Sequence, residues 1–219
     1  TVKRSGRSSR RSSMNRVRAS PLMVSTCWRG CMRWPRTRVR SRAMPSFTAW
    51  NQGARVRAQA ESMLAGLQYA KSEAAARNGQ VRFQLTTSID ATCALSVTGT
   101  AWVVDAVDAD PATDSVEGRC NATPSDTIAP SILQVRSGTE TGAGTAVSAD
   151  QPSIVFSGLG RVVPMPAGTI NIEITTADPS QCAINAGGRV TCLRLAISPG
   201  GQVRMCNPTL ASGEPAACE

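Results

Sequence analysis

Residues 55–79 read RVRAQAESMLAGLQYAKSEAAARNG, and this stretch decides the fold. It is rich in Ala, Gln, Arg, Leu and Met, which are good helix formers. Its apolar residues recur at spacings of four and three and so form one stripe along a helix: Val56, Ala60, Met63, Leu67, Ala70 and Ala74. Asn78-Gly79 supplies a left-handed stop. The sequence therefore predicts an amphipathic helix over residues 52–78, about seven turns long, with one face against a partner surface.

Downstream of this helix, short apolar segments separated by turn residues predict a run of strands. Val81, Phe83 and Leu85 alternate with polar residues, which marks the first strand. The other strands are expected at residues 93–97, 101–104, 132–136, 153–156, 161–163, 169–175, 190–197 and 202–206. Clusters of Gly and Pro between them provide the turns. One long helix followed by strands predicts an α+β domain in which the helix packs on antiparallel sheet.

The positive charge of the chain is concentrated in its first 44 residues. They contain 13 Lys and Arg and no acidic residue, whereas the rest of the chain contains 11 basic residues and all 15 acidic ones. The formal charge is thus +13 in the first segment and −4 in the remainder. The overall charge of +9 would ordinarily suggest a nucleic-acid-binding protein, but the body of this chain is mildly acidic.

Residues 1–43 mix Arg and Ser with isolated Trp and Cys, and they show neither helical nor strand periodicity. This composition is typical of a basic, disordered arm. It is also what a GC-rich gene gives when it is read in the wrong frame, and we favour that interpretation. An enzyme or a nucleic-acid-binding protein that uses Trp28 and Trp34 would require these residues to be authentic. The predicted organisation is a basic segment (1–43), a helix (44–79) and a β-rich domain (80–219).

The chain contains no histidine, which removes the commonest general base, the Ser-His-Asp triad and the usual zinc ligand sets. Six of its eight cysteines lie in the acidic body at wide spacing, without a C-x-x-C pair: Cys93, Cys120, Cys182, Cys192, Cys206 and Cys218. This pattern predicts structural disulfides and an oxidising compartment such as a periplasm. Fifteen pairings are possible, and the pairing of neighbours (93 with 120, 182 with 192, 206 with 218) is the simplest.

Five acidic residues crowd positions 105–117 and could in principle bind calcium. Their spacing fails the EF-hand pattern, so we expect a solvated loop there. The sequence predicts no metal site, no cofactor and no catalytic residue.

The step AMPSF at residues 43–47 leads into the helix that ends at Gly79, and LRLAISPGGQVRMCNP at residues 193–208 forms a hairpin pattern. Between them, Ile154-Val155-Phe156 and Gly160-Arg161 mark a strand and a turn. Together these segments resemble the GspH/FimT family, which comprises minor pseudopilins of type II secretion and minor type IV pilins. The resemblance covers residues 43–219. It implies a pilin-like α+β fold, stapled by disulfides, and a role without enzymatic activity.

The resemblance further implies a subunit that helps to initiate or cap a pseudopilus. Its expected partners are other pilins or pseudopilins and the inner-membrane assembly platform. The family expectation is an anchor in the bacterial inner membrane and a periplasmic globular domain. Family members begin with a short basic leader, a Phe-Thr-Leu-x-Glu start and an apolar helix. This pattern does not occur before Met44, and no stretch of about 18 apolar residues is present to span a bilayer.

DNA binding is the alternative function. Some FimT-type members are thought to bind DNA through a Gly-Arg-x-Arg step in the last hairpin, which here reads GQVR at residues 201–204. Because Gln202 replaces the first Arg, one phosphate-binding charge is missing, and the electrostatic attraction should be weak. The residues expected to contribute are Arg204, Gln202, Arg194 and Arg189. We rank this hypothesis below filament assembly.

Overall fold

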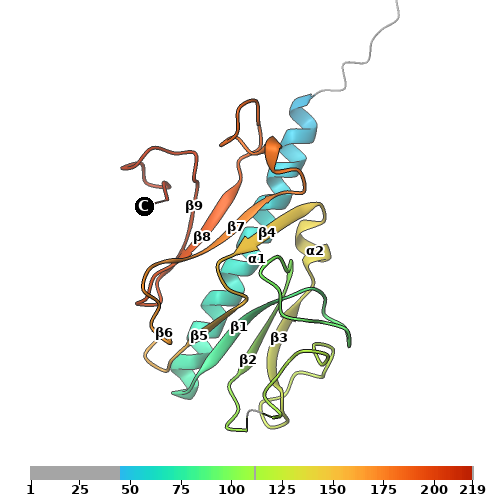
Figure 1. Ribbon diagram of the computed structural model, residues 1–219, viewed down its shortest axis with the longest axis vertical. Coiled ribbons are helices and arrows are strands. Elements are labelled where there is room, and N and C mark those ends of the chain that lie inside the picture. Colours follow the sequence, from blue (N-terminus) through green and yellow to red (C-terminus); the bar gives the residue numbers. More distant parts are fainter. Residues whose placement is uncertain (1–44, 111, 219) are drawn as a thin grey trace, which may run out of the picture. The chain divides into compact units, whose positions relative to one another are not determined.

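The computed structural model describes residues 45–110 and 112–218 (Figure 1). All of them belong to one compact unit, Arg42–Glu219. The prediction of a basic, disordered segment at residues 1–43 lies outside the described residues. Two α-helices, a 3-10 helix and nine strands are present in the described part: α1 (Pro45–Arg77), β1 (Val81–Thr86), β2 (Ala101–Ala106), β3 (Ser131–Arg136), α2 (Gly138–Gly142), β4 (Thr145–Ala149), β5 (Ser153–Phe156), β6 (Val162–Val163), β7 (Ile170–Thr176), η1 (Pro179–Gln181), β8 (Leu193–Ile197) and β9 (Val203–Cys206).

Helix α1 begins at Pro45, within the helical segment expected at residues 44–79 and seven residues before the amphipathic stretch at 52–78. Proline is favoured in a first turn because its missing N–H has no acceptor there in any case. The helix ends as predicted, since Asn78 adopts a φ of 49° and the Gly79 N–H donates to the Ala74 carbonyl at 3.1 Å. No helix in the described ranges has both the length and the apolar composition that crossing a bilayer requires.

The predicted apolar stripe of α1 is the centre of the core. All six of its residues, from Val56 to Ala74, have no exposed surface. In Figure 1 the helix runs behind two separate sheets, and it contacts β1 and β2 of one and β7 and β8 of the other. One sheet has the order β3-β2-β1-β5-β6 and the other β4-β7-β8-β9, with antiparallel neighbours throughout. The expected α+β architecture is confirmed.

The five-stranded sheet is covered on both faces. Phe83 and Trp102 face α1, and their rings pack 5.6 Å apart. On the opposite face, Val103 and Ile132 form a second small core with the cysteine pair Cys93 and Cys120. Strand β2 is therefore buried along almost its whole length.

Three local predictions differ from the structure. The strand expected at residues 93–97 is wrong, because Leu95 makes only an isolated bridge to Thr86 and Cys93 is tied into a turn by its N–H bond to the Asp90 carbonyl. Strand β4 was not predicted, since Val147 is its only large apolar residue. The short helix α2 occupies an expected loop and is capped by Ser137, whose side chain accepts from the Thr139 N–H.

The close approach of α1 to the five-stranded sheet depends on Gly66. A Cβ at this position would lie 2.9 Å from Phe83 Cε2 and from Trp102 Cη2, whereas at Gly53 its nearest neighbour would be Val190 Cγ1 at 3.9 Å. We expect Gly66→Ala to lower the free energy of unfolding by about 1–3 kcal/mol through overpacking. The matched variant Gly53→Ala should raise it by up to about 1 kcal/mol through helix propensity. Urea unfolding measures both, and equal effects of the two variants would contradict this account.

Candidate functional site

The turn between β8 and β9 is locked to the turn between β5 and β6. Gly201 has a φ of 79°, and a Cβ there would lie 1.8 Å from the Gly160 carbonyl oxygen, so position 201 requires glycine. The Val162 N–H donates to the Pro199 carbonyl at 3.2 Å. Lys71 on α1 donates from Nζ to the Gly201 carbonyl at 2.9 Å. One contact point thus joins the helix and both sheets.

The structure does not bring the four predicted DNA-binding residues together. Arg194 is paired with Glu173 across the β7–β8 ladder, with Nε 2.5 Å from Oε1. Arg204 lies on the edge strand β9, opposite Ala196, and Gln202 lies in the adjoining turn. Arg189 lies before β8, beside a groove at the N-terminal part of α1.

The sequence analysis assigned Arg161 only to the turn at Gly160-Arg161 and did not include it among the DNA-binding residues. The structure places it next to the β8–β9 turn, since its Cα would lie 3.4 Å from a Cβ at Gly201. Arg161 is exposed. The contact between the two glycine turns produces this proximity, and the wide separation of positions 161 and 201 in the sequence gave no sign of it.

The acidic stretch at residues 105–117 is anchored to the sheet by one arginine. Arg82 on β1 pairs with Asp105 on β2 and, through Nη1, with Asp114 Oδ2 at 2.6 Å. Gln84 donates from Nε2 to Asp105 Oδ1 at 2.6 Å. The expectation of a solvated loop is wrong for Asp105, whose side chain is completely buried because it faces the second core.

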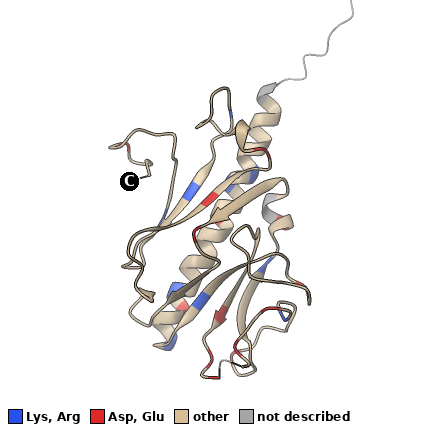
Figure 2. Cartoon of the chain, in the orientation of Figure 1, with Lys and Arg blue, Asp and Glu red and all other residues tan. Residues whose placement is uncertain are grey.

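Other acidic side chains gather on the segment that joins the end of β2 to the start of β3 (Figure 2). Burial raises the pKa of Asp105 to about 6. The hydrogen bonds and charge of Arg82, and the hydrogen bond from Gln84, oppose this rise.

Among the described residues, no group of three or more His, Cys, Asp or Glu is arranged to hold a metal ion.

Three disulfides join the six cysteines of the body: Cys93–Cys120, Cys182–Cys192 and Cys206–Cys218. These are the neighbour pairs that the sequence analysis favoured as the simplest pairing. The first one holds a long loop against the five-stranded sheet. The other two close the loop before β8 and attach the C-terminal tail to β9.

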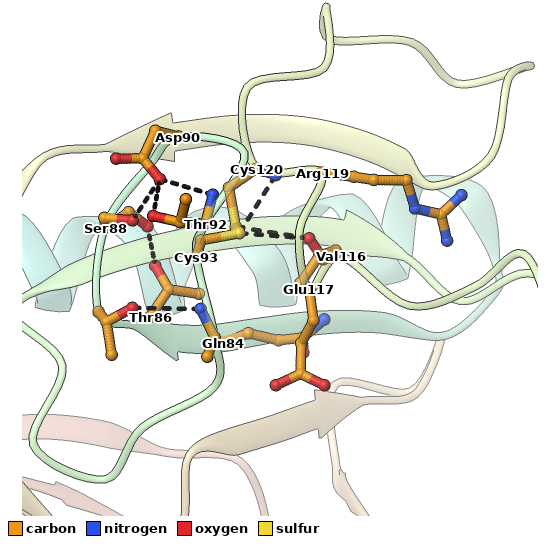
Figure 3. Close-up of a disulfide and its surroundings, with 12 residues drawn as sticks. Gln84, Thr86, Ser88, Asp90, Thr92, Cys93, Val116, Glu117, Arg119 and Cys120 are labelled. Carbon is orange, nitrogen blue, oxygen red and sulfur yellow. Dashed lines mark hydrogen bonds between the residues drawn. A yellow bond between two sulfur atoms is a disulfide. The ribbon is translucent and has the colours of Figure 1, made fainter.

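The turn beside the first disulfide is organised by Asp90 (Figure 3). Its Oδ1 accepts from the Ser88 hydroxyl at 2.9 Å and from the Thr92 hydroxyl and N–H at 2.6 and 2.7 Å. These bonds, the Thr92 hydroxyl first, lower the pKa of Asp90. The turn positions Cys93 beneath Cys120, and Asp90 has no further role that the geometry suggests.

Comparison with known proteins gives one family and two solved structures. The family model described as "Type II transport protein GspH" matches residues 59–201. A crystal structure of the Pseudomonas aeruginosa PAO1 type IV minor pilin FimU, in space group P21, is 19% identical, with 77% of this chain and 98% of that chain covered and a TM-score of 0.49. A crystal structure of the same pilin in space group P65 is 16% identical and has a TM-score of 0.44. That comparison covers 72% of this chain and 98% of that chain. Among curated proteins, none matches this chain.

The buried carboxyl of Asp105 makes stability depend on pH. Because its pKa is raised to about 6 in the fold, the folded state holds this proton more tightly than the unfolded chain. The group therefore stabilises the fold at pH 4, and this contribution is lost as the pH rises through 6. Relative to Asp105→Asn, the wild-type free energy of unfolding should fall by up to about 3 kcal/mol between pH 4 and pH 7. Urea titrations at both pH values test this, and a constant difference between the two proteins would refute it.

Proposed function

Since the chain belongs to the GspH family, whose model matches residues 59–201, we propose that this minor pseudopilin or pilin subunit helps to initiate or cap the pseudopilus of a type II secretion system. The role is structural and requires no catalytic residue. Its partners are other pilins or pseudopilins of the filament and the inner-membrane assembly platform. Stable disulfides form in oxidising compartments, which supports a periplasmic location for the β-rich domain. Anchoring in the inner membrane is the expectation for the family.

The observation that carries this proposal is the unequal burial of α1. No residue from Phe47 to Arg55 is buried, and the first buried position is Val56. From there to Ala74 the stripe is completely enclosed by the two sheets. A helix that is fixed at one end and only partly covered at the other is suited to connect a globular domain to neighbouring subunits.

A second candidate function is DNA binding during uptake, which one observation favours. Arg161 lies beside the β8–β9 turn and adds a positive charge near the position where Gln202 lacks one. Against it, Arg194 is engaged by Glu173 and Arg189 lies at the groove beside α1. Few phosphate contacts would remain, so the salt-dependent attraction would be small.

The filament role predicts that the subunit fractionates with the filament. We expect a tagged full-length chain to appear, well below the amount of the major subunit, in filaments sheared from the bacterium that encodes it. Deletion of the gene should reduce the number of filaments counted by electron microscopy, and the restored gene should recover it. A chain that stays out of the sheared fraction while the major subunit is present would contradict the proposal.

A mobility shift separates the two candidate functions. Residues 44–219 are used, which leaves out the +13 segment, and we expect no retardation of double-stranded DNA even at low salt. The DNA-binding candidate would instead gain support from retardation that Arg161→Ala with Arg204→Ala abolishes. Arg136→Ala, at the end of β3 on the edge of the five-stranded sheet opposite β6, is the matched control that should leave any such retardation unchanged.

A further inference from the structure

The segment that joins β2 to β3 ends in a stretch rich in hydroxyl side chains and proline. Residues 122–131 read ATPSDTIAPS and contain four hydroxyl residues and two prolines. Stretches of Ser, Thr and Pro are typical of surface segments that carry O-linked sugars. The four hydroxyl groups differ in what they contact, and this difference identifies the one that is available for a reaction.

Three of the four hydroxyl groups are already engaged in the fold. Ser131 is buried and donates to the two carboxylate oxygens of Asp108, at 3.0 and 3.2 Å. Ser125 Oγ accepts from the N–H groups of Thr127 and Ile128, at 3.2 and 3.1 Å. The Thr127 hydroxyl lies 3.3 Å from Ser125 Oγ, within hydrogen-bond distance. These three side chains therefore stabilise the loop and its attachment to β3.

The fourth hydroxyl group, on Thr123, has no such role. Thr123 is exposed, and neither its hydroxyl nor its main chain forms a hydrogen bond with any residue in the described ranges. It belongs to no helix, strand or turn, and the following Pro124 favours an extended backbone at Thr123. An exposed hydroxyl on an unpaired, extended backbone can enter the cleft of a modifying enzyme while the domain stays folded.

The surroundings of Thr123 are fixed to the side of the sheet that faces away from α1. Cys120 forms a disulfide with Cys93 (Figure 3). Ala122 packs against the second core, which this disulfide shares with Val103 and lies opposite α1. A bulky group on Thr123 would therefore leave helix α1 and its contacts undisturbed.

Other exposed hydroxyl groups beside prolines provide a comparison. Ser180 follows Pro179 and donates to Asp178 Oδ1 at 2.7 Å. Thr209 follows Pro208 and donates to Asn207 Oδ1 at 2.7 Å. Exposure and a neighbouring proline are thus shared by several positions, and the free hydroxyl is what distinguishes Thr123. Thr209 is the matched control.

Asn121-Ala122-Thr123 also fits the N-x-T pattern of N-linked glycosylation. Asn121, however, lies inside a turn that the Ala122 N–H closes by donating to the Arg119 carbonyl at 2.9 Å. It also adjoins the disulfide-bonded Cys120. The backbone of Asn121 is therefore fixed, whereas that of Thr123 is not, and the geometry favours the hydroxyl over the amide.

We propose that Thr123 is an O-glycosylation site, modified by a membrane-bound transferase that uses a sugar carried on polyprenyl diphosphate. This inference rests on the periplasmic location that forms part of the proposed function. Thr123 Oγ1 attacks the anomeric carbon of the sugar and forms a C–O bond, and the bond from that carbon to the diphosphate oxygen breaks. The hydroxyl proton passes to a base of the transferase, and polyprenyl diphosphate leaves. The step requires no oxidant or reductant.

Mass spectrometry of the chain from its own bacterium tests the proposal. The full chain is purified, reduced, alkylated and cleaved after Lys and Arg, which releases residues 120–136 as one peptide and residues 205–219 as another. We expect the first peptide to carry the mass of one or more sugars. Electron-transfer fragmentation should place this mass on Thr123, and alkaline β-elimination should remove it. The second peptide, with the control Thr209, should be unmodified.

Three variants test whether the hydroxyl of Thr123 is the acceptor. Thr123→Val removes the hydroxyl and should abolish the added mass, whereas Thr123→Ser keeps a hydroxyl and should retain it. Thr209→Val, the matched control, should leave the modification unchanged. Both positions are exposed, so all three variants should melt close to the wild-type temperature. An unmodified wild-type peptide, a sugar on Asn121 or on Ser125 instead, or an added mass that persists in Thr123→Val would overturn the proposal.

The fractions of the cell separate this proposal from the filament role. If the chain is present in sheared filaments without a sugar on Thr123, the glycosylation proposal fails and the filament role stands. If the chain carries the sugar in the cell envelope but is missing from sheared filaments, the filament role fails and the glycosylation proposal stands.

Discussion

The burial of one stripe on α1 is the constraint on which the rest of the unit depends. The stripe from Val56 to Ala74 is covered by two sheets. No strand of one sheet pairs with a strand of the other. Fully burying Met63 and Leu67 contributes about 1.5–3 kcal/mol each. Gly66, which lies between them in the sequence, lets Phe83 and Trp102 come close to the helix. The stripe and the inward-facing residues of both sheets thus form one apolar core.

Much of this arrangement can be predicted from the sequence, because the signals are local. The stripe, the stop at Asn78 and most strands follow from periodicity and turn residues. Interactions between distant residues could not be found in that way. The pairing of Arg82 with Asp105 depends on the β1–β2 register, and Arg161 reaches the β8–β9 turn only because two glycine turns touch. The false strand at residues 93–97 had a strand-like pattern, but a disulfide and an Asp90 turn determine its conformation.

The same division of α1 explains how the fold can serve a filament. The enclosed part fixes the direction of the helix relative to both sheets, and Lys71 strengthens this by holding the β8–β9 turn. The first turns of the helix are only partly covered and carry the exposed Phe47 and Trp50. The Cys206–Cys218 disulfide holds the C-terminal tail to β9.

Native-state hydrogen exchange tests most directly whether α1 unites the two sheets. The account predicts that the most protected amides of β1 and β2 and those of β7 and β8 exchange through one opening, with equal free energies that match global unfolding. The apolar stripe should then become accessible in that same event. If the four-stranded sheet instead opened at a clearly lower free energy while α1 and the five-stranded sheet stayed protected, the claim of a single shared core would be contradicted.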